Sequence, residues 1–221
     1  ALDRAAVEER RARGTASHAA RRKSWQDAAA AGEGASPVDF AWLASAIGRI
    51  LDDETICVNE YDLLPQFLDF ERPGSYFSYP PSGGLGWGLG AALGAKLAAP
   101  DKTVVCCVGD GSYLFGEPLT AHWLSRARNL PVLFVVFDNE AWNAVKVSTG
   151  MVYPEGATLA APSVPFSDLR PQGRFDQVVG AFGGHGERVE RGAEVLPALR
   201  RALRVVREER RQALVQVSCA R

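Results

Sequence analysis

Apolar and polar positions follow two alternating spacings along this chain. Short runs of consecutive apolar, largely β-branched residues are typical of strands that are buried on both faces of a parallel sheet. Such strands are predicted over 55–58, 104–108, 132–137 and 213–217, and a further short strand is predicted over 185–189. Segments between them place apolar residues three or four positions apart, the spacing of a helix that packs one face on a sheet.

This alternation of strands and helices predicts an α/β fold, a doubly wound parallel sheet with helices on both faces. The stretch 151–170 carries several prolines and few periodic apolar positions, so we predict a loop there. Helices are predicted over 37–51, in an Ala- and Leu-rich segment that ends near 99–100, and over 118–128, 142–147, 175–182 and 193–209, with a helical segment near 63–67.

The first part of the chain differs from the rest. Residues 1–34 are rich in Ala, Arg and Glu and poor in large apolar side chains, which predicts a polar helix or a partly ordered linker. Trp25 is a candidate anchor of this arm on the main domain. Ser36 and Pro37 favour the start of a new helix. We therefore expect a helical arm over 1–35 and a globular domain over 36–221.

Composition excludes some function classes. The 221 residues are 47% hydrophobic and carry a net charge of −1, which gives no argument for nucleic acid or an anionic membrane surface. No apolar stretch is long enough to span a bilayer, and the N-terminus has no signal-peptide core, so a cytoplasmic protein is expected. The four cysteines, each within or beside a predicted strand, are expected to be buried reduced thiols: Cys57, Cys106, Cys107 and Cys219.

Polar residues of a specific kind follow two of the predicted strands. Gly109-Asp110-Gly111-Ser112 comes after 104–108, and Asp138-Asn139 comes after 132–137. The carboxyl ends of parallel strands meet at one edge of the sheet, where ligands bind. Asp110 and Asn139 should therefore lie together, and their carboxylate and amide oxygens suit Mg²⁺. Taken singly, each segment is most often a turn or a cap.

The combination resembles the signature of thiamine-diphosphate-dependent enzymes. Gly109-Asp110-Gly111, 27 residues (112–138) and Asn139 are similar to the family pattern of Gly-Asp-Gly, a gap and Asn. From residue 37 onwards, the chain resembles the diphosphate-binding (PP) domain of the acetolactate synthase and benzoylformate decarboxylase group. The resemblance implies thiamine diphosphate and Mg²⁺ as cofactors. It implies Asp110, Asn139 and the Ala141 carbonyl as metal ligands, and Gly111, Ser112 and Trp142 as diphosphate contacts.

A second glycine-rich segment, 82–88, precedes the Ala- and Leu-rich helix. Taken alone, such glycines indicate either tight helix packing or close approach of a ligand. By the resemblance, Gly83, Gly84 and Leu85 bind the aminopyrimidine, and Leu85 wedges the cofactor into its bent shape. The residues expected towards the substrate are Ala144, Val145 and Ser148.

The implied activity is decarboxylation, carboligation or C–C lysis of a 2-oxo acid or related carbonyl substrate. No catalytic residue is expected in this chain, because the family's activating Glu lies on a separate pyrimidine-binding (PYR) domain. That domain is expected on a partner subunit or in missing N-terminal domains, in a dimer or tetramer of PP/PYR pairs.

Two alternatives stay open at this point. One is a non-catalytic, PP-like scaffold or regulatory subunit. The other is a nicotinamide-binding domain, which the absence of Gly-x-Gly-x-x-Gly at the first strand–helix turn makes remote. The three histidines, His18, His122 and His185, lack metal-ligand spacing and are interpreted as structural or surface residues.

Overall fold

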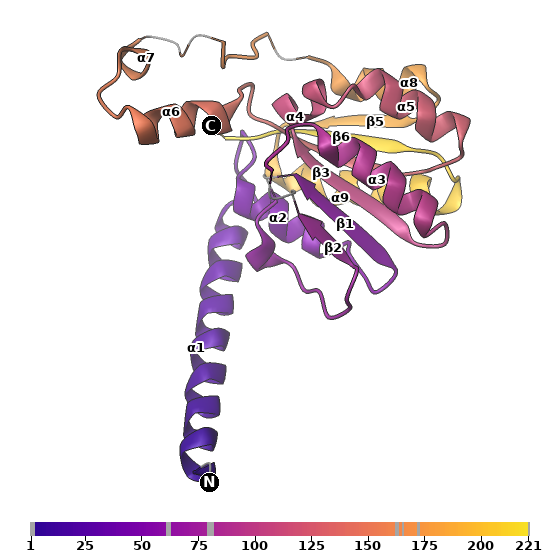
Figure 1. Cartoon of the computed structure of the whole chain (residues 1–221). Helices are drawn as coiled ribbons and strands as arrows, with labels where there is room; N and C mark the ends of the chain where they lie inside the picture. The colour runs from indigo at the N-terminus through magenta and orange to yellow at the C-terminus, as the bar shows by residue number, and fades with distance from the viewer. Residues whose placement is uncertain are drawn as a thin grey trace.

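A single parallel sheet organises the chain in the computed structural model, which describes residues 3–60, 63–78, 82–161, 164, 166–171 and 173–220 (Figure 1). Its strands are β1 Thr55–Glu60, β2 Tyr76–Ser78, β3 Thr103–Gly109, β4 Leu133–Asp138, β5 His185–Val189 and β6 Ala213–Ser218. Among the described residues, they lie in the order β2-β1-β3-β4-β6-β5, and every neighbouring pair is parallel. The predicted fold class is confirmed.

Helices cover both faces of the sheet. Residues of α2 (Phe40–Gly48) and α9 (Gly192–Glu208) pack with Val105 and Cys107 on one face. The opposite face packs Cys106 and its neighbours against three helices: α3 Trp87–Ala98, α5 Pro118–Ala127 and α8 Phe175–Ala181. Because successive residues of a strand point to opposite faces, both faces of β3 are apolar and buried. The four cysteines are free and buried, as predicted.

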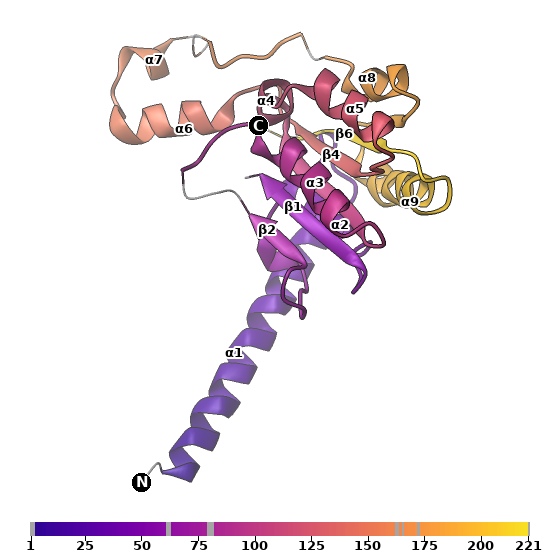
Figure 2. The ribbon, with the colours of Figure 1, turned by 45° about the vertical axis from the view of Figure 1, so that its right-hand side comes forward.

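Helix α1 (Arg4–Ala31) stands away from the sheet, and only its C-terminal end lies against the body of the molecule (Figures 1 and 2). Asp3 caps its first turn by accepting from the Ala5 and Ala6 amides. Near its C-terminal end, Arg22 pairs with Asp69 at 2.7 Å, in the segment that follows the short helix η1 (Pro65–Phe67). Trp25 is partly buried. The division of the chain at residue 35 stays a prediction.

Four elements differ most from the predictions. A short helix, α4 (Asp110–Phe115), begins directly at the Gly-Asp-Gly segment, ahead of the helix predicted from 118. Helix α6 (Asn143–Val152) runs beyond 147, and α7 (Ala157–Ala160) lies within the predicted loop, so the loop prediction is wrong over these residues. The edge strand β2 was not predicted, because its three residues are too few to show periodicity. Figure 2 shows α6 and α7 extending away from the sheet.

No helix among the described residues has both the length and the apolar character that a membrane crossing requires.

Candidate functional site

The candidate site lies at the carboxyl ends of β1, β3 and β4. After β1, the chain adds β2 on one side and β3 on the other, so the order of the strands reverses between β1 and β3. Crevices at such a reversal, outside the carboxyl ends of the strands, are the usual ligand sites of open α/β sheets. The register pairs Gly109 of β3 with Phe137 of β4, which brings the segments after both strands to the same level.

Asp110 and Asn139 converge on one backbone group. The Ala141 amide donates to Asp110 Oδ2 at 3.1 Å and to Asn139 Oδ1 at 3.0 Å. The other oxygen of Asp110, Oδ1, accepts from the Gly111 amide at 2.8 Å. Two side-chain oxygens from separate strand ends therefore face the same point, as expected from the sequence. The Ala141 carbonyl, the third predicted metal ligand, accepts from the Asn143 amide at 2.8 Å.

Burial dominates the electrostatics of this site. Asp110 is 2% exposed, and this desolvation raises the pKa of its carboxyl to about 7, with the neighbouring Asp138 carboxylate as a further cause. The amides of Gly111 and Ala141 act in the opposite direction on this pKa. The ionised form of Asp110 is therefore costly without a cation, and a divalent cation beside it would favour that form.

Asp138 is held in place by a buried glutamine. Gln216 Nε2 donates to Asp138 Oδ2 at 2.5 Å, and the Glu140 amide donates to Asp138 Oδ1 at 3.2 Å. Gln216 is fully buried, and its own Oε1 accepts from the Phe175 amide at 2.9 Å. Gln216 thus holds a second carboxylate, that of Asp138, next to Asp110.

A cavity of about 60 Å³ opens at this edge. It is lined by Leu85, Gly109, Asp110, Gly111, Ser112, Asn139, Ala141, Trp142, Asn143, Ala144 and Val145. Nine predicted site residues are among them, from segments that lie far apart in the sequence. Gly83, Gly84 and Ser148 were also predicted, and they do not line this cavity. Gly109 and Asn143 line the cavity without having been predicted as site residues.

The indole of Trp142 lies against Gly111. A Cβ at Gly111 would stand 1.8 Å from Trp142 Cδ1 and 2.2 Å from Nε1, so only glycine leaves room for the ring. Within the described part of the chain, Trp142 Nε1 is buried and has no hydrogen-bond partner. Buried indole N–H groups usually have an acceptor. An oxygen-rich ligand in the cavity would supply one.

Glu60 is the main residue that sequence reasoning missed at this edge. It is the last residue of β1 and is fully buried, and its carboxylate accepts from the amides of Gly86 and Gly88. An acidic residue at the carboxyl end of a buried parallel strand, ahead of a glycine-rich turn in the sequence, was the available signal.

The histidines do not contribute to this cavity. His18 is exposed on α1, and His185 pairs with Glu187 at 2.7 Å. His122 is fully buried between Tyr113 and Gln212, at 2.8 Å from each, a structural role in agreement with the prediction. Among the residues described, no group of three or more His, Cys, Asp or Glu side chains forms a metal-binding cluster.

Fold and geometry together define a doubly wound α/β domain with a candidate small-ligand site at its carboxyl edge. Residues 60–217 match the family model of the thiamine pyrophosphate enzyme, C-terminal TPP binding domain. This match spans more than half of the chain, and the chain therefore belongs to that family.

Individual relatives agree with this assignment. A probable acetolactate synthase of Mycobacterium bovis is 39% identical over 138 residues, which are 62% of this chain and 23% of that protein. A benzoylformate decarboxylase of Pseudomonas aeruginosa is 37% identical over 102 residues, 46% of this chain and 19% of the relative. The chain thus spans about a quarter of the length of the curated relatives that it matches.

A solved structure extends the likeness to three dimensions. The thiamine diphosphate-dependent 4-hydroxybenzoylformate decarboxylase of Rhodococcus jostii RHA1 superimposes with a TM-score of 0.71 at 27% sequence identity. The superposition covers 84% of this chain and 33% of that chain.

Proposed function

We propose that this chain is the diphosphate-binding domain of an Mg²⁺- and thiamine-diphosphate-dependent enzyme that acts on a 2-oxo acid or related carbonyl substrate. The proposed reaction class is decarboxylation, carboligation or C–C lysis. The observation that carries the proposal is the convergence of Asp110 and Asn139 on the Ala141 amide, beside the contact between Gly111 and Trp142. Family membership supports the thiamine cofactor.

The donor set suits Mg²⁺. Asp110 and Asn139 supply a carboxylate and an amide oxygen, both hard ligands, and the Ala141 carbonyl is the proposed third ligand. Mg²⁺ takes few protein ligands and completes its shell with phosphate and water oxygens. A site with two converging side chains therefore fits this ion, and the charge of the ion would favour the ionised form of the buried Asp110 carboxyl.

The residues around the cavity also suit a diphosphate. Trp142 Nε1 is a buried donor in need of an acceptor, and phosphate oxygens accept hydrogen bonds well. Gly111 leaves space for the indole, and Ser112 adds a hydroxyl to the cavity lining. We propose that these three residues contact the diphosphate, while the turn of Gly83, Gly84 and Leu85 receives the aminopyrimidine.

When bound, thiamine diphosphate supplies a carbon nucleophile and an electron sink for breaking or forming a C–C bond. The residues of this chain hold and orient it. Asp110 and Asn139 hold the metal, Trp142 fixes the diphosphate, and Leu85 presses on the ring system from its place in the cavity wall. Ala144, Val145 and Ser148 on α6 are proposed to face the substrate.

The activating Glu is proposed to come from a PYR domain, either on a partner chain or elsewhere in the same protein. Exposed large apolar side chains on α4, α5 and α6 support a covering partner, because such side chains rarely gather on a surface that stays in water. On α4 and α5 these are Leu114, Phe115, Leu119 and Trp123, each 43–62% exposed. Further exposed apolar residues lie on α6, including Met151 and Val152. A dimer or tetramer of PP/PYR pairs would bury both groups.

Calorimetric titration with thiamine diphosphate and Mg²⁺ tests this function. The chain is titrated alone and with its PYR domain supplied in the same polypeptide or as a second chain. We expect binding that the PYR domain tightens and that Asn139→Ala abolishes, while Asn129→Ala, at the far edge of the sheet, leaves it intact. A folded complex that binds no thiamine diphosphate would contradict the proposal and favour a scaffold or regulatory subunit.

A further inference from the structure

Glu60 is a buried carboxyl group that the proposed metal and diphosphate contacts do not use. It ends β1 and has no exposed surface. Its Oε1 accepts from the Gly86 amide at 2.6 Å, and its Oε2 accepts from the Gly88 amide at 2.7 Å. Hydrogen bonds from amides to an ionised carboxylate are short and roughly twice as strong as neutral ones.

No lysine or arginine of the described residues forms an ion pair with Glu60, so backbone amides offset the cost of burying its carboxylate. A buried carboxylate without such partners would be strongly unfavourable. The two glycines are 26 and 28 residues away in the sequence, at the start of α3. Glu60 therefore ties the end of β1 to the glycine-rich turn that leads into α3.

The turn is confined on more than one side. Gly86 adopts the left-handed conformation with φ +84°, and a Cβ there would stand 2.8 Å from the Gly116 amide nitrogen, just after α4. A Cβ at Gly88 would stand 2.8 Å from Glu60 Oε2 and 2.9 Å from Val108 Cγ1. The backbone from Gly86 to Gly88 thus sits close to the Glu60 carboxylate, β3 and the end of α4.

Leu85 directly precedes this confined segment and lines the same cavity as Asp110 and Trp142. We propose that Glu60 is a positioning residue, which sets the place of the Gly83–Leu85 turn through the Gly86 and Gly88 amides. This inference rests on the proposed function, in which that turn receives the aminopyrimidine. Glu60 itself does not contact the cofactor in this account.

Two substitutions probe the anchor. Glu60→Gln keeps the shape of the side chain, but its amide NH₂ meets an N–H donor, so one of the two bonds is lost. Glu60→Asp keeps the charge but is one methylene shorter and cannot span both amides from the end of β1. Glu54→Gln is the matched control, because Glu54 directly precedes the same strand at the opposite edge and is 64% exposed.

The experiment compares two ligands on the chain with its PYR domain supplied: magnesium thiamine diphosphate, and magnesium pyrophosphate, which lacks the aminopyrimidine. We expect Glu60→Gln and Glu60→Asp to weaken the affinity for thiamine diphosphate about 10- to 100-fold, the usual range for a supporting residue. The affinity for pyrophosphate should stay unchanged. Glu54→Gln should change neither affinity. Equal weakening of both ligands by Glu60→Gln, or of neither, would overturn the inference.

A second measurement needs no variant. In the unliganded wild-type chain, hydrogen exchange should show the Gly86 and Gly88 amides protected, and unprotected amides would overturn the anchor. Wild type that binds neither ligand would overturn the proposed function together with this inference. Wild type and Glu60→Gln that bind thiamine diphosphate equally would overturn the inference alone.

Discussion

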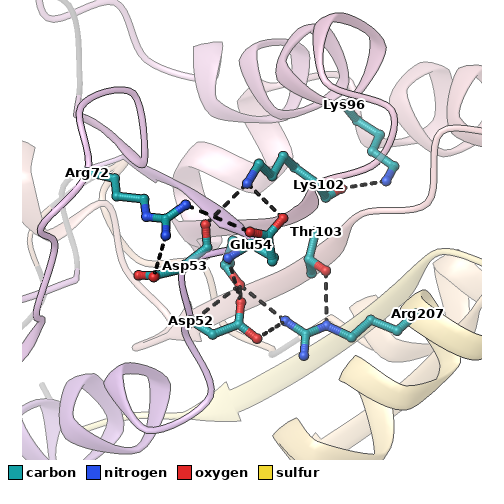
Figure 3. A network of polar contacts seen from close by, with 9 residues as sticks. Asp52, Asp53, Glu54, Arg72, Lys96, Lys102, Thr103 and Arg207 are labelled. Atoms are coloured by element: carbon teal, nitrogen blue, oxygen red, sulfur yellow. Dashed lines mark hydrogen bonds and ion pairs between the residues drawn. The ribbon is translucent and has the colours of Figure 1, made fainter.

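Acidic residues have opposite surroundings at the two ends of the sheet: the amino edge, where the strands begin, and the carboxyl edge, where they end. At the amino edge, carboxylates are exposed and paired with side-chain cations: Arg72 contacts Asp53 at 2.9 Å, and Lys102 contacts Glu54 at 2.8 Å. Arg207 joins Asp52 to Thr103 in the same network (Figure 3). Lysine and arginine side chains from three separate segments thus neutralise this edge.

At the carboxyl edge, Glu60 and Asp110 are 0% and 2% exposed and accept from backbone amides. Within the part of the chain that the structure describes, neither residue forms an ion pair with Lys or Arg. Backbone amides orient a carboxylate and bring a partial positive charge to it, but they do not supply a full cation. The amino edge is therefore neutralised by its own side chains, whereas the carboxyl edge is not, and the proposed function supplies the missing cation there with the ligand.

The largest effect is expected from Asp110→Ala. Removal of this carboxylate takes away a proposed ligand of the metal, and even supporting residues of metal sites change affinity about 10- to 100-fold. We expect at least a 100-fold loss of thiamine diphosphate affinity in the presence of Mg²⁺, measured by calorimetry. Asp53→Ala at the amino edge is the control and should leave the affinity unchanged. If Asp110→Ala kept its affinity for thiamine diphosphate, the carboxyl edge would not differ from the amino edge in its need for a cation.

Gly111→Ala should have the next largest effect. The new methyl would stand 1.8 Å from Trp142 Cδ1, so the indole must leave its place in the cavity wall. Overpacking of this kind costs about 1–3 kcal/mol, measurable by urea unfolding, and should weaken cofactor binding as well.

Gly94→Ala gives the comparison for that variant, since nothing lies within 4 Å of a Cβ at this position of α3. Alanine is the better helix former by about 1 kcal/mol, so Gly94→Ala should be neutral or slightly stabilising. Equal destabilisation by the two variants would show that glycine content, and not the contact with Trp142, determines the result.

A smaller effect is expected from His122, which is buried away from both groups of carboxylates. Gln212 Oε1 can only accept, so His122 Nδ1 donates to it and Nε2 accepts from the Tyr113 hydroxyl. Burial lowers the pKa of His122 below its ordinary 6.5. The unfolded state then binds the proton more readily, and stability present above the unfolded pKa is lost as pH falls through the folded pKa.

Urea unfolding at about pH 7.5 and about pH 5.5 measures this loss. His122→Gln should reduce the difference in stability between the two pH values, whereas His18→Gln, on the exposed face of α1, should leave it as in wild type. An unchanged difference in His122→Gln would assign the acid sensitivity to other groups.

The smallest effect is expected at the amino edge. Glu54→Gln removes the exposed pairing with Lys102, and exposed ion pairs contribute little because water and salt screen them. The unfolding midpoint should stay within the spread of replicate measurements and should not depend on salt more than in wild type. A large loss of stability would mean that the network in Figure 3 is more than a solvated set of charges.

Much of the fold was predictable because its strands are continuous apolar runs. The strands β3, β4 and β6 are buried along nearly their whole length, so their sequences consist mainly of apolar residues. β2 was missed because it has three residues and Phe77 is 47% exposed. α4 was not predicted as a helix of its own, because two glycines around Asp110 favour a turn, and tertiary packing overrides that local preference.

The candidate site also has one part that the sequence predicts and another that it does not. The meeting of Asp110 and Asn139 follows from strand order alone, since both come directly after adjacent parallel strands. The role of Glu60 could not be derived so simply, because its partners lie 26 and 28 residues further along the chain. The fit of Trp142 on Gly111 likewise depends on how α6 leaves the sheet, which no local pattern fixes.

The most direct test of the account is a crystal of the chain with the proposed PYR domain, thiamine diphosphate and Mn²⁺ in place of Mg²⁺, with anomalous scattering to locate the metal. The account predicts one manganese peak at about 2 Å from the side-chain oxygens of both Asp110 and Asn139, with a diphosphate oxygen on the same ion. A metal and diphosphate bound away from these two residues, or no thiamine diphosphate bound at all, would contradict it.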